Sequence, residues 1–255
     1  MIKLTRKILS NLRLTEPNNQ SLGTSKYLKY AIGEIVLVVI GILIALQINN
    51  WNENKIINAK VRDLLHALQS DLAQDTLLIT NKLPYVIAQY QLNESLRARL
   101  AKPEATLDTL IKITRHEFNP NWSYQIVYNM NAYNSLNQSG LIEILSDTLK
   151  THIKNFYNNK LYLNSKVDKI TDGYRDKVSS FVDTYAFGST SLHDQGELIN
   201  NLIWGKINPS HLAATFQGIS NFKRILFTET KDEMEYSLKN SKNLLHHIHK
   251  YLEEK

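Results

Sequence analysis

The sequence predicts an all-α protein in which an N-terminal transmembrane helix is followed by an antiparallel helical bundle. Three observations predict this fold. Residues 35–46 form an unbroken apolar run, the apolar residues beyond position 51 recur at helical and often heptad spacing, and the chain lacks a series of alternating β-branched runs with hairpin turns. The 255 residues are 43% apolar with only nine glycines and five prolines, which is enough for a buried core.

The composition excludes several classes of site and partner. With no cysteine, the chain has no disulfide framework, thiolate metal site, cysteine nucleophile or lipoprotein anchor. Residues 1–29 carry six basic residues against one acidic residue, which accounts for +5 of the formal charge of +6. The rest of the chain therefore lacks a basic surface that could neutralise a run of phosphates, and we expect no nucleic-acid partner.

The first element is a transmembrane anchor over residues 30–51, long enough at about 1.5 Å per residue to cross roughly 30 Å of hydrocarbon. Tyr27 and Tyr30 precede the apolar core and Trp51 follows it, as expected of residues at the two membrane interfaces. These aromatic flanks argue against a buried helix of a soluble protein. A cleaved signal peptide is the other alternative, but ALQINNW after the apolar run offers no small-x-small cleavage site.

The basic residues of the 1–29 tail favour a cytoplasmic N-terminus at the inner membrane, which places residues 52–255 in the periplasm as an extracytoplasmic helical domain. The tail itself has two interpretations. Its apolar and basic residues can form an amphipathic helix on an anionic leaflet, or the tail is a basic flank without fixed structure.

Two segments resemble a known family. The run KYAIGEIVLVVIGILIALQINNWNE, residues 29–53, is similar to the signature of a family of single-pass inner-membrane proteins from Bacteroidota, the domain of unknown function numbered sixty-ninety. The run NAYNSLNQSGLIEILSDTLKTHIKNFY, residues 131–157, is similar to its second block, in which a Ser-Gly turn joins two helices. The resemblance implies a single anchor followed by an all-helical extracytoplasmic region, and it transfers no activity or catalytic residue.

Beyond the anchor, an apolar seam predicts a helix up to a kink or break at Pro84, and a second helix over residues 86–100 that ends before Pro103. A short helix over residues 105–115 follows, closed by Asn119-Pro120. The first of these seams comprises Ile57, Val61, Leu64, Leu68, Leu72, Ile79 and Leu83.

The second half of the chain contains clear helix boundaries. Gly140 ends a helix that begins near Ser123, and Ser146 caps a long helix whose seam includes Lys160 among apolar residues. A loop at residues 187–188 precedes a short helix over residues 194–204. Asn208-Pro209 then starts the C-terminal helical region.

Candidate chemistry is sparse. His246 and His249 share a helix face and are the one weak metal candidate, against the alternative of a solvated last turn. Residues 115–117 (Arg-His-Glu) are expected to be a polar helix end, and Asp168, Asp172 and Asp176 a solvated acidic stripe. We therefore expect no catalytic residue, no cofactor and no enzymatic activity.

Within the anchor, Glu34, Val38, Gly41 and Ala45 recur at spacings of four, three and four, so a carboxyl group shares a stripe with a small-residue pair. This stripe predicts a helix-pairing face, the alternative being a carboxyl group that reaches toward the headgroups. The first functional hypothesis is a membrane-anchored interaction or scaffold module with a protein partner or a second copy. A ligand-sensing bundle that acts through a partner membrane protein is the alternative, and an enzyme would require buried His, Asp and Glu to converge in one cleft.

Overall fold

The computed structural model describes residues 23–120, 126–185 and 196–254, and these residues confirm the all-α fold class, with no strand among them. The chain divides into two compact units, Met1–Asn58 and Ala59–Lys255. The long helix α2, Gly23–Leu100, contains the predicted anchor in the first unit. The predicted amphipathic tail helix lies outside the described residues.

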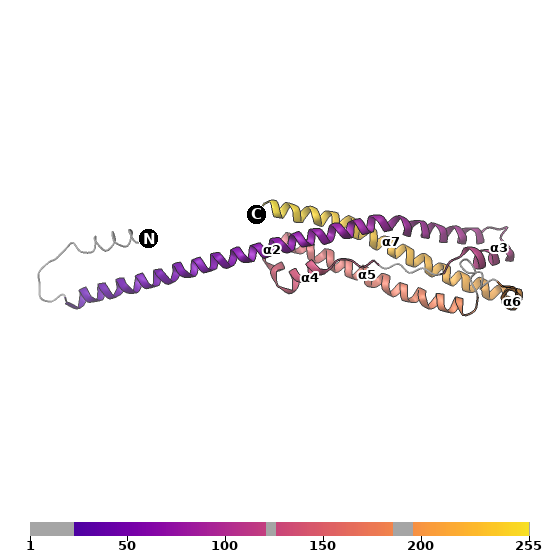
Figure 1. Cartoon of the computed structure of the whole chain (residues 1–255), viewed down its shortest axis with the longest axis horizontal. Helices are drawn as coiled ribbons and strands as arrows, with labels where there is room; N and C mark the ends of the chain where they lie inside the picture. The colour runs from indigo at the N-terminus through magenta and orange to yellow at the C-terminus, as the bar shows by residue number, and fades with distance from the viewer. Residues whose placement is uncertain (1–22, 121–125, 186–195, 255) are drawn as a thin grey trace. The chain divides into compact units, whose positions relative to one another are not determined.

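The second unit is built on three long helices that lie side by side: residues 59–100 of α2, α5 (Asp147–Val182) and α7 (Pro209–Glu253) (Figure 1). The start of this part of α2 packs with the start of α5 and the end of α7 in one core cluster. The later part of α2 packs with the end of α5 and the start of α7 in another. Thus α7 is antiparallel to the other two helices, whereas α2 and α5 run in the same direction.

The parallel pair requires a return segment between α2 and α5, and this segment holds the short elements. They are α3 (Leu107–Lys112), a π-helical turn (Ile113–Glu117), α4 (Asn131–Gln138) and a 3-10 turn (Leu141–Ile144). The helix predicted over residues 123–140 is shorter than expected, because residues 126–130 are not helical. Residues 123–125 lie outside the description, as does the predicted loop at 187–188.

Pro84 lies inside α2, where the sequence predicted a kink or break. A proline removes one helical hydrogen bond and crowds the preceding turn, at a cost of about 3 kcal/mol. Ile79 and Val86, on either side of it, are fully buried in the same core cluster. Packing of this apolar face therefore offsets the cost and keeps the helix continuous.

The predicted helix boundaries at Gly140, Ser146 and Asn208 are confirmed. Gly140 adopts a left-handed conformation with φ of 71°, directly after α4. The Ser146 side chain accepts a hydrogen bond from the Leu149 amide at 3.4 Å, and Asn208 accepts one from the His211 amide at 3.1 Å, with Pro209 in the first helical position. Residues 196–208 contain α6 (Glu197–Leu202) and a 3-10 turn (Trp204–Lys206).

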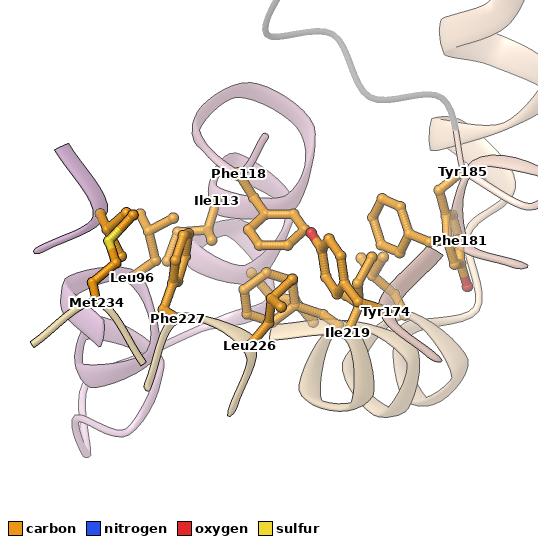
Figure 2. Packing of buried hydrophobic residues seen from close by; sticks show 14 of the residues in the cluster. Leu96, Ile113, Phe118, Tyr174, Phe181, Tyr185, Ile219, Leu226, Phe227 and Met234 are labelled. Carbon is orange, nitrogen blue, oxygen red and sulfur yellow. The ribbon is translucent and has the colours of Figure 1, made fainter. Parts of the chain in front are cut away.

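The core cluster between the end of α5 and the start of α7 is rich in aromatic rings (Figure 2). Phe118 contacts Phe181 and Phe216 edge to face, with ring centroids 6.1 and 5.1 Å apart. A Cβ atom at Gly173 would lie 3.3 Å from the Phe222 ring, so the glycine permits α5 and α7 to approach closely. This aromatic cluster anchors the return segment to the bundle through Phe118.

Candidate functional site

The centre of the bundle contains an ion pair that is shielded from water. The Lys160 ammonium of α5 lies 2.7 Å from an Asp75 carboxylate oxygen of α2, and the two side chains are 1% and 0% exposed. The other Asp75 oxygen accepts hydrogen bonds from the backbone amide and side-chain amide of Asn129, at 3.0 and 2.8 Å. Burial lowers the pKa of Lys160, and the Asp75 carboxylate opposes that shift.

A second buried carboxyl group, that of Glu233 on α7, is linked to Lys160 through Tyr128. The Lys160 ammonium is 3.9 Å from the centroid of the Tyr128 ring. The Tyr128 hydroxyl donates to Glu233 at 2.9 Å, and the Ser237 hydroxyl donates to the other Glu233 oxygen at 2.7 Å. Burial raises the pKa of Glu233 above its ordinary value. The network therefore joins α2, α5, α7 and the segment before α4.

A cavity of about 320 Å³ opens beside this network, between the segment before α4 and helices α5 and α7. Its polar lining includes Thr230 and Glu233, both buried, and Asn164 and Asp168 of α5. The Thr230 hydroxyl has no hydrogen-bond partner among the residues that the structure describes. The apolar lining consists of Ile126, Val127, Met130, Leu161 and Val167, together with the Tyr128 ring.

The sequence contains only part of the signal for this site. The heptad seam of α5 pointed to Lys160 as a charged residue at a buried position, and the structure confirms that it is buried. Asp75 lies seven residues after Leu68, and Glu233 lies seven after Leu226, so each also occupies a heptad position next to buried leucines. For both Asp75 and Glu233 the available signal was a charged residue within an apolar seam, and neither was predicted from it.

Another lysine, Lys223 of α7, is buried against the middle of the return segment. Its ammonium donates to the Asn119 carbonyl, and it lies 4.9 Å from the centroid of the Phe118 ring. Burial lowers its pKa to about 8. The arrangement ties the return segment to α7 at a second point.

The two histidines of the metal candidate lie on the surface of α7. His246 and His249 are exposed, and His249 lies 3.2 Å from Glu253. Between them in sequence, His247 stacks on His152 of α5, with ring centroids 4.1 Å apart. Over the described ranges, no group of three or more His, Cys, Asp or Glu side chains is placed to hold a metal ion.

The other polar candidates are dispersed over the surface of the second unit. Arg115 donates to Asn200 at 2.7 Å and lies over the Trp204 ring, while Glu117 pairs with Arg99. Asp172 forms an exposed ion pair with Arg175 at 3.3 Å. All three aspartates of the expected solvated stripe, Asp168, Asp172 and Asp176, are exposed, and Asp168 in addition lines the cavity.

In the first unit, the predicted interface residues Tyr27, Tyr30 and Trp51 are exposed. So are the four residues of the predicted pairing face, Glu34, Val38, Gly41 and Ala45. A Cβ atom at Gly41 would meet nothing within 4 Å. The interface and pairing roles of these residues stay predictions. Within the described chain, α2 is the helix that is long and apolar enough to cross a membrane.

The family of unknown function DUF6090 matches residues 34–202, which include most of the apolar segment, the return segment and all of α5. No curated protein and no solved structure matches the chain. Since the match covers well over half of the sequence, the chain belongs to the family of unknown function DUF6090.

Proposed function

We propose that the chain is a single-pass inner-membrane protein whose periplasmic helical domain binds a protein partner or a second copy of itself. In this proposal residues 1–29 lie in the cytoplasm, residues 30–51 cross the membrane and residues 52–255 lie in the periplasm. The observation that carries the proposal is the contrast between the two units. The apolar side chains of the first are exposed, whereas those of the second form two buried core clusters.

The exposure of the apolar side chains of the first unit shows why this contrast supports a membrane anchor. Leu37 is 59% exposed and Leu43 is 57% exposed, and soluble proteins rarely expose a continuous apolar surface of this kind. Such a helix is stable in the hydrocarbon core of a membrane, because the backbone groups of a helix are already hydrogen bonded to one another.

Topology is tested with fusions to two reporters after Lys255, alkaline phosphatase and green fluorescent protein. Because the basic tail favours a cytoplasmic N-terminus, we expect the alkaline phosphatase fusion to be active and the fluorescent fusion to be dark. A fluorescent fusion with inactive phosphatase would reverse the proposed orientation.

Partner binding is supported by apolar side chains that α2 leaves exposed in the second unit. Leu77, Tyr85 and Leu92 are 63%, 51% and 48% exposed, and their spacings of eight and seven residues place them toward one side of the helix. A photo-crosslinking amino acid at Leu77 or Tyr85, in native membranes, is expected to give a discrete adduct. The same group at the exposed Asp172 of α5 is the control, and equal labelling from all three positions would contradict a specific surface on α2.

A second candidate function is ligand sensing, in which the bundle binds a small molecule and passes the signal to a partner membrane protein. The cavity beside Glu233 and Thr230 favours it, because this cavity combines apolar walls with a few buried polar groups. Crosslinking with and without a bound ligand distinguishes the candidates, since a sensor changes its adduct when the cavity is filled.

A further inference from the structure

The cavity between α5, α7 and the segment before α4 has an unbalanced polar lining. Its lining includes two carboxyl groups, Glu233 within and Asp168 at an exposed position, and no lysine or arginine in the described chain lines it. Lys160, the nearest buried cation in the network, is paired with Asp75. Within the described residues, the groups that donate to Glu233 are the Tyr128 and Ser237 hydroxyls, neither of which carries a positive charge.

Thr230 provides an independent observation. Its side chain is 3% exposed, and its hydroxyl has no partner in the described part of the chain. Other threonines of the long helices donate to the carbonyl four residues earlier, as Thr228 does to Arg224 at 3.0 Å. A buried hydroxyl without a partner is unfavourable, so a group that supplies a hydrogen bond here stabilises the site.

The two groups are placed to act together. Thr230 and Glu233 are three residues apart on α7, a spacing at which side chains are neighbours on one helix face. The walls around them are apolar, and Val127 and Leu161 are 85% and 48% exposed. A ligand that fits this lining has a small hydrogen-bonding cation at one end and an apolar body at the other.

We propose that this cavity binds a primary ammonium group carried on a short apolar body, with the ammonium at Glu233 and Thr230 and the body against the apolar walls. An ammonium has three donors, which suits the Glu233 carboxylate, the Thr230 oxygen and the Asn164 amide oxygen. The proposal rests on ligand sensing as the function of the domain and names the class of ligand that the cavity binds. The source of the ammonium is a free amine or a lysine side chain of a partner.

Calorimetric titration of the full chain in lipid nanodiscs tests the ligand class with three matched probes. Cyclohexylammonium, cyclohexanol and cyclohexanecarboxylate have the same ring and differ in charge. We expect cyclohexylammonium to bind at least tenfold more tightly than cyclohexanol, and cyclohexanecarboxylate not to bind. Equal affinity for the ammonium and the alcohol, or no binding of the ammonium at 50 mM, would overturn the proposal.

Two substitutions test the assigned groups. Thr230→Val keeps the shape of the side chain and removes the hydroxyl, and Glu233→Gln removes the charge; each is expected to weaken cyclohexylammonium binding about tenfold or more. Ser241→Ala is the matched control. Ser241 also lies on α7, its buried hydroxyl has no hydrogen-bond partner among the described residues, and it is not part of the cavity lining. Should Glu233→Gln fail to fold, Thr230→Val decides the outcome, and an unchanged affinity in that variant would overturn the assignment.

A fourth probe, Nα-acetyl-lysine amide, distinguishes the two sources. Tighter binding of this compound than of cyclohexylammonium identifies a partner's lysine as the occupant, and weaker binding identifies a free amine. These titrations measure occupancy of the cavity alone. An absence of binding in the titrations would overturn the ligand class without affecting the crosslinking test of partner binding, and an absence of crosslinks would not affect the titrations.

Discussion

The ion pair of Asp75 and Lys160 lies where neither charge reaches water. A buried charge that loses its partner costs about 3–5 kcal/mol, whereas an exposed pair contributes at most about 1 kcal/mol. Lys160→Met alone, or Asp75→Leu alone, is therefore expected to lower the free energy of unfolding by several kcal/mol.

The double variant Asp75→Leu with Lys160→Met removes both charges together and is expected to recover a large part of that loss. Urea unfolding followed by circular dichroism provides the measurement. Asp172→Asn, in an exposed ion pair, is the control, with a change below about 1 kcal/mol. Additive losses in the double variant would show that the two charges do not interact.

Lys223 gives a pH dependence of stability with a defined sign. Burial lowers its pKa from 10.5 in the unfolded chain to about 8 in the folded chain. Below pH 8 the lysine is charged in both states and the full cost of burying it is present. Between pH 8 and 10.5 the unfolded chain binds more protons, so stability rises with pH by up to about 3 kcal/mol.

The measurement compares the free energy of unfolding at pH 7 and pH 9.5 for the natural chain, Lys223→Met and Lys239→Met. The Lys223→Met variant is expected to be more stable than the natural chain at pH 7 and to lose this part of the pH dependence. Lys239 is exposed on the same helix, so its substitution should leave the slope unchanged. A slope that persists in Lys223→Met would assign it to other groups.

These residues show how far the sequence leads at this scale. The seam of α5 identified Lys160 as buried, because its position follows from the helical repeat alone. Its partner Asp75 is 85 residues away in the chain, and the register that joins them depends on how α2 and α5 pack. Spacing within one helix carries no information on that register, so the cavity and its polar lining were missed.

At the scale of elements, helix ends were predictable because they depend on local geometry. Ser146, Asn208 and Gly140 each perform the predicted capping or stop role. The continuity of α2 through Pro84 was not predictable, since it depends on core packing. The late start of α4 has a similar cause: Tyr128 and Asn129 bond to Glu233 and Asp75 across the bundle.

Replacing glycine by alanine is expected to have opposite effects on stability at two positions. Gly140→Ala places a side chain at φ of 71°, and should lower stability by about 1–2 kcal/mol although a Cβ atom there meets nothing within 4 Å. Gly218 lies inside α7, also with free space around it, so Gly218→Ala should raise stability by up to about 1 kcal/mol. Thermal unfolding of both variants is the measurement, and equal shifts would contradict the role of backbone conformation.

At the scale of the whole molecule, the pairing prediction concerns association between copies in the membrane. Gly41→Ile adds bulk to the stripe of Glu34, Val38, Gly41 and Ala45 and should weaken association. Gly33→Ile is the matched control, because it makes the same change about 80° away around the helix. A membrane two-hybrid assay compares them. Equal signals from both variants and the natural chain would mean that the stripe faces lipid.

The order of the three long helices in the chain governs when the second unit can fold. Both core clusters include residues of α7, which is synthesised after the other two long helices. At roughly 5–20 residues per second, α2 waits on the order of ten to thirty seconds for the helix that covers it. A chain truncated after Thr228 should therefore be digested by protease where the full chain resists. During this interval the apolar seams of α2 and α5 lack the helix that buries them, so the growing domain is most open to aggregation before α7 emerges.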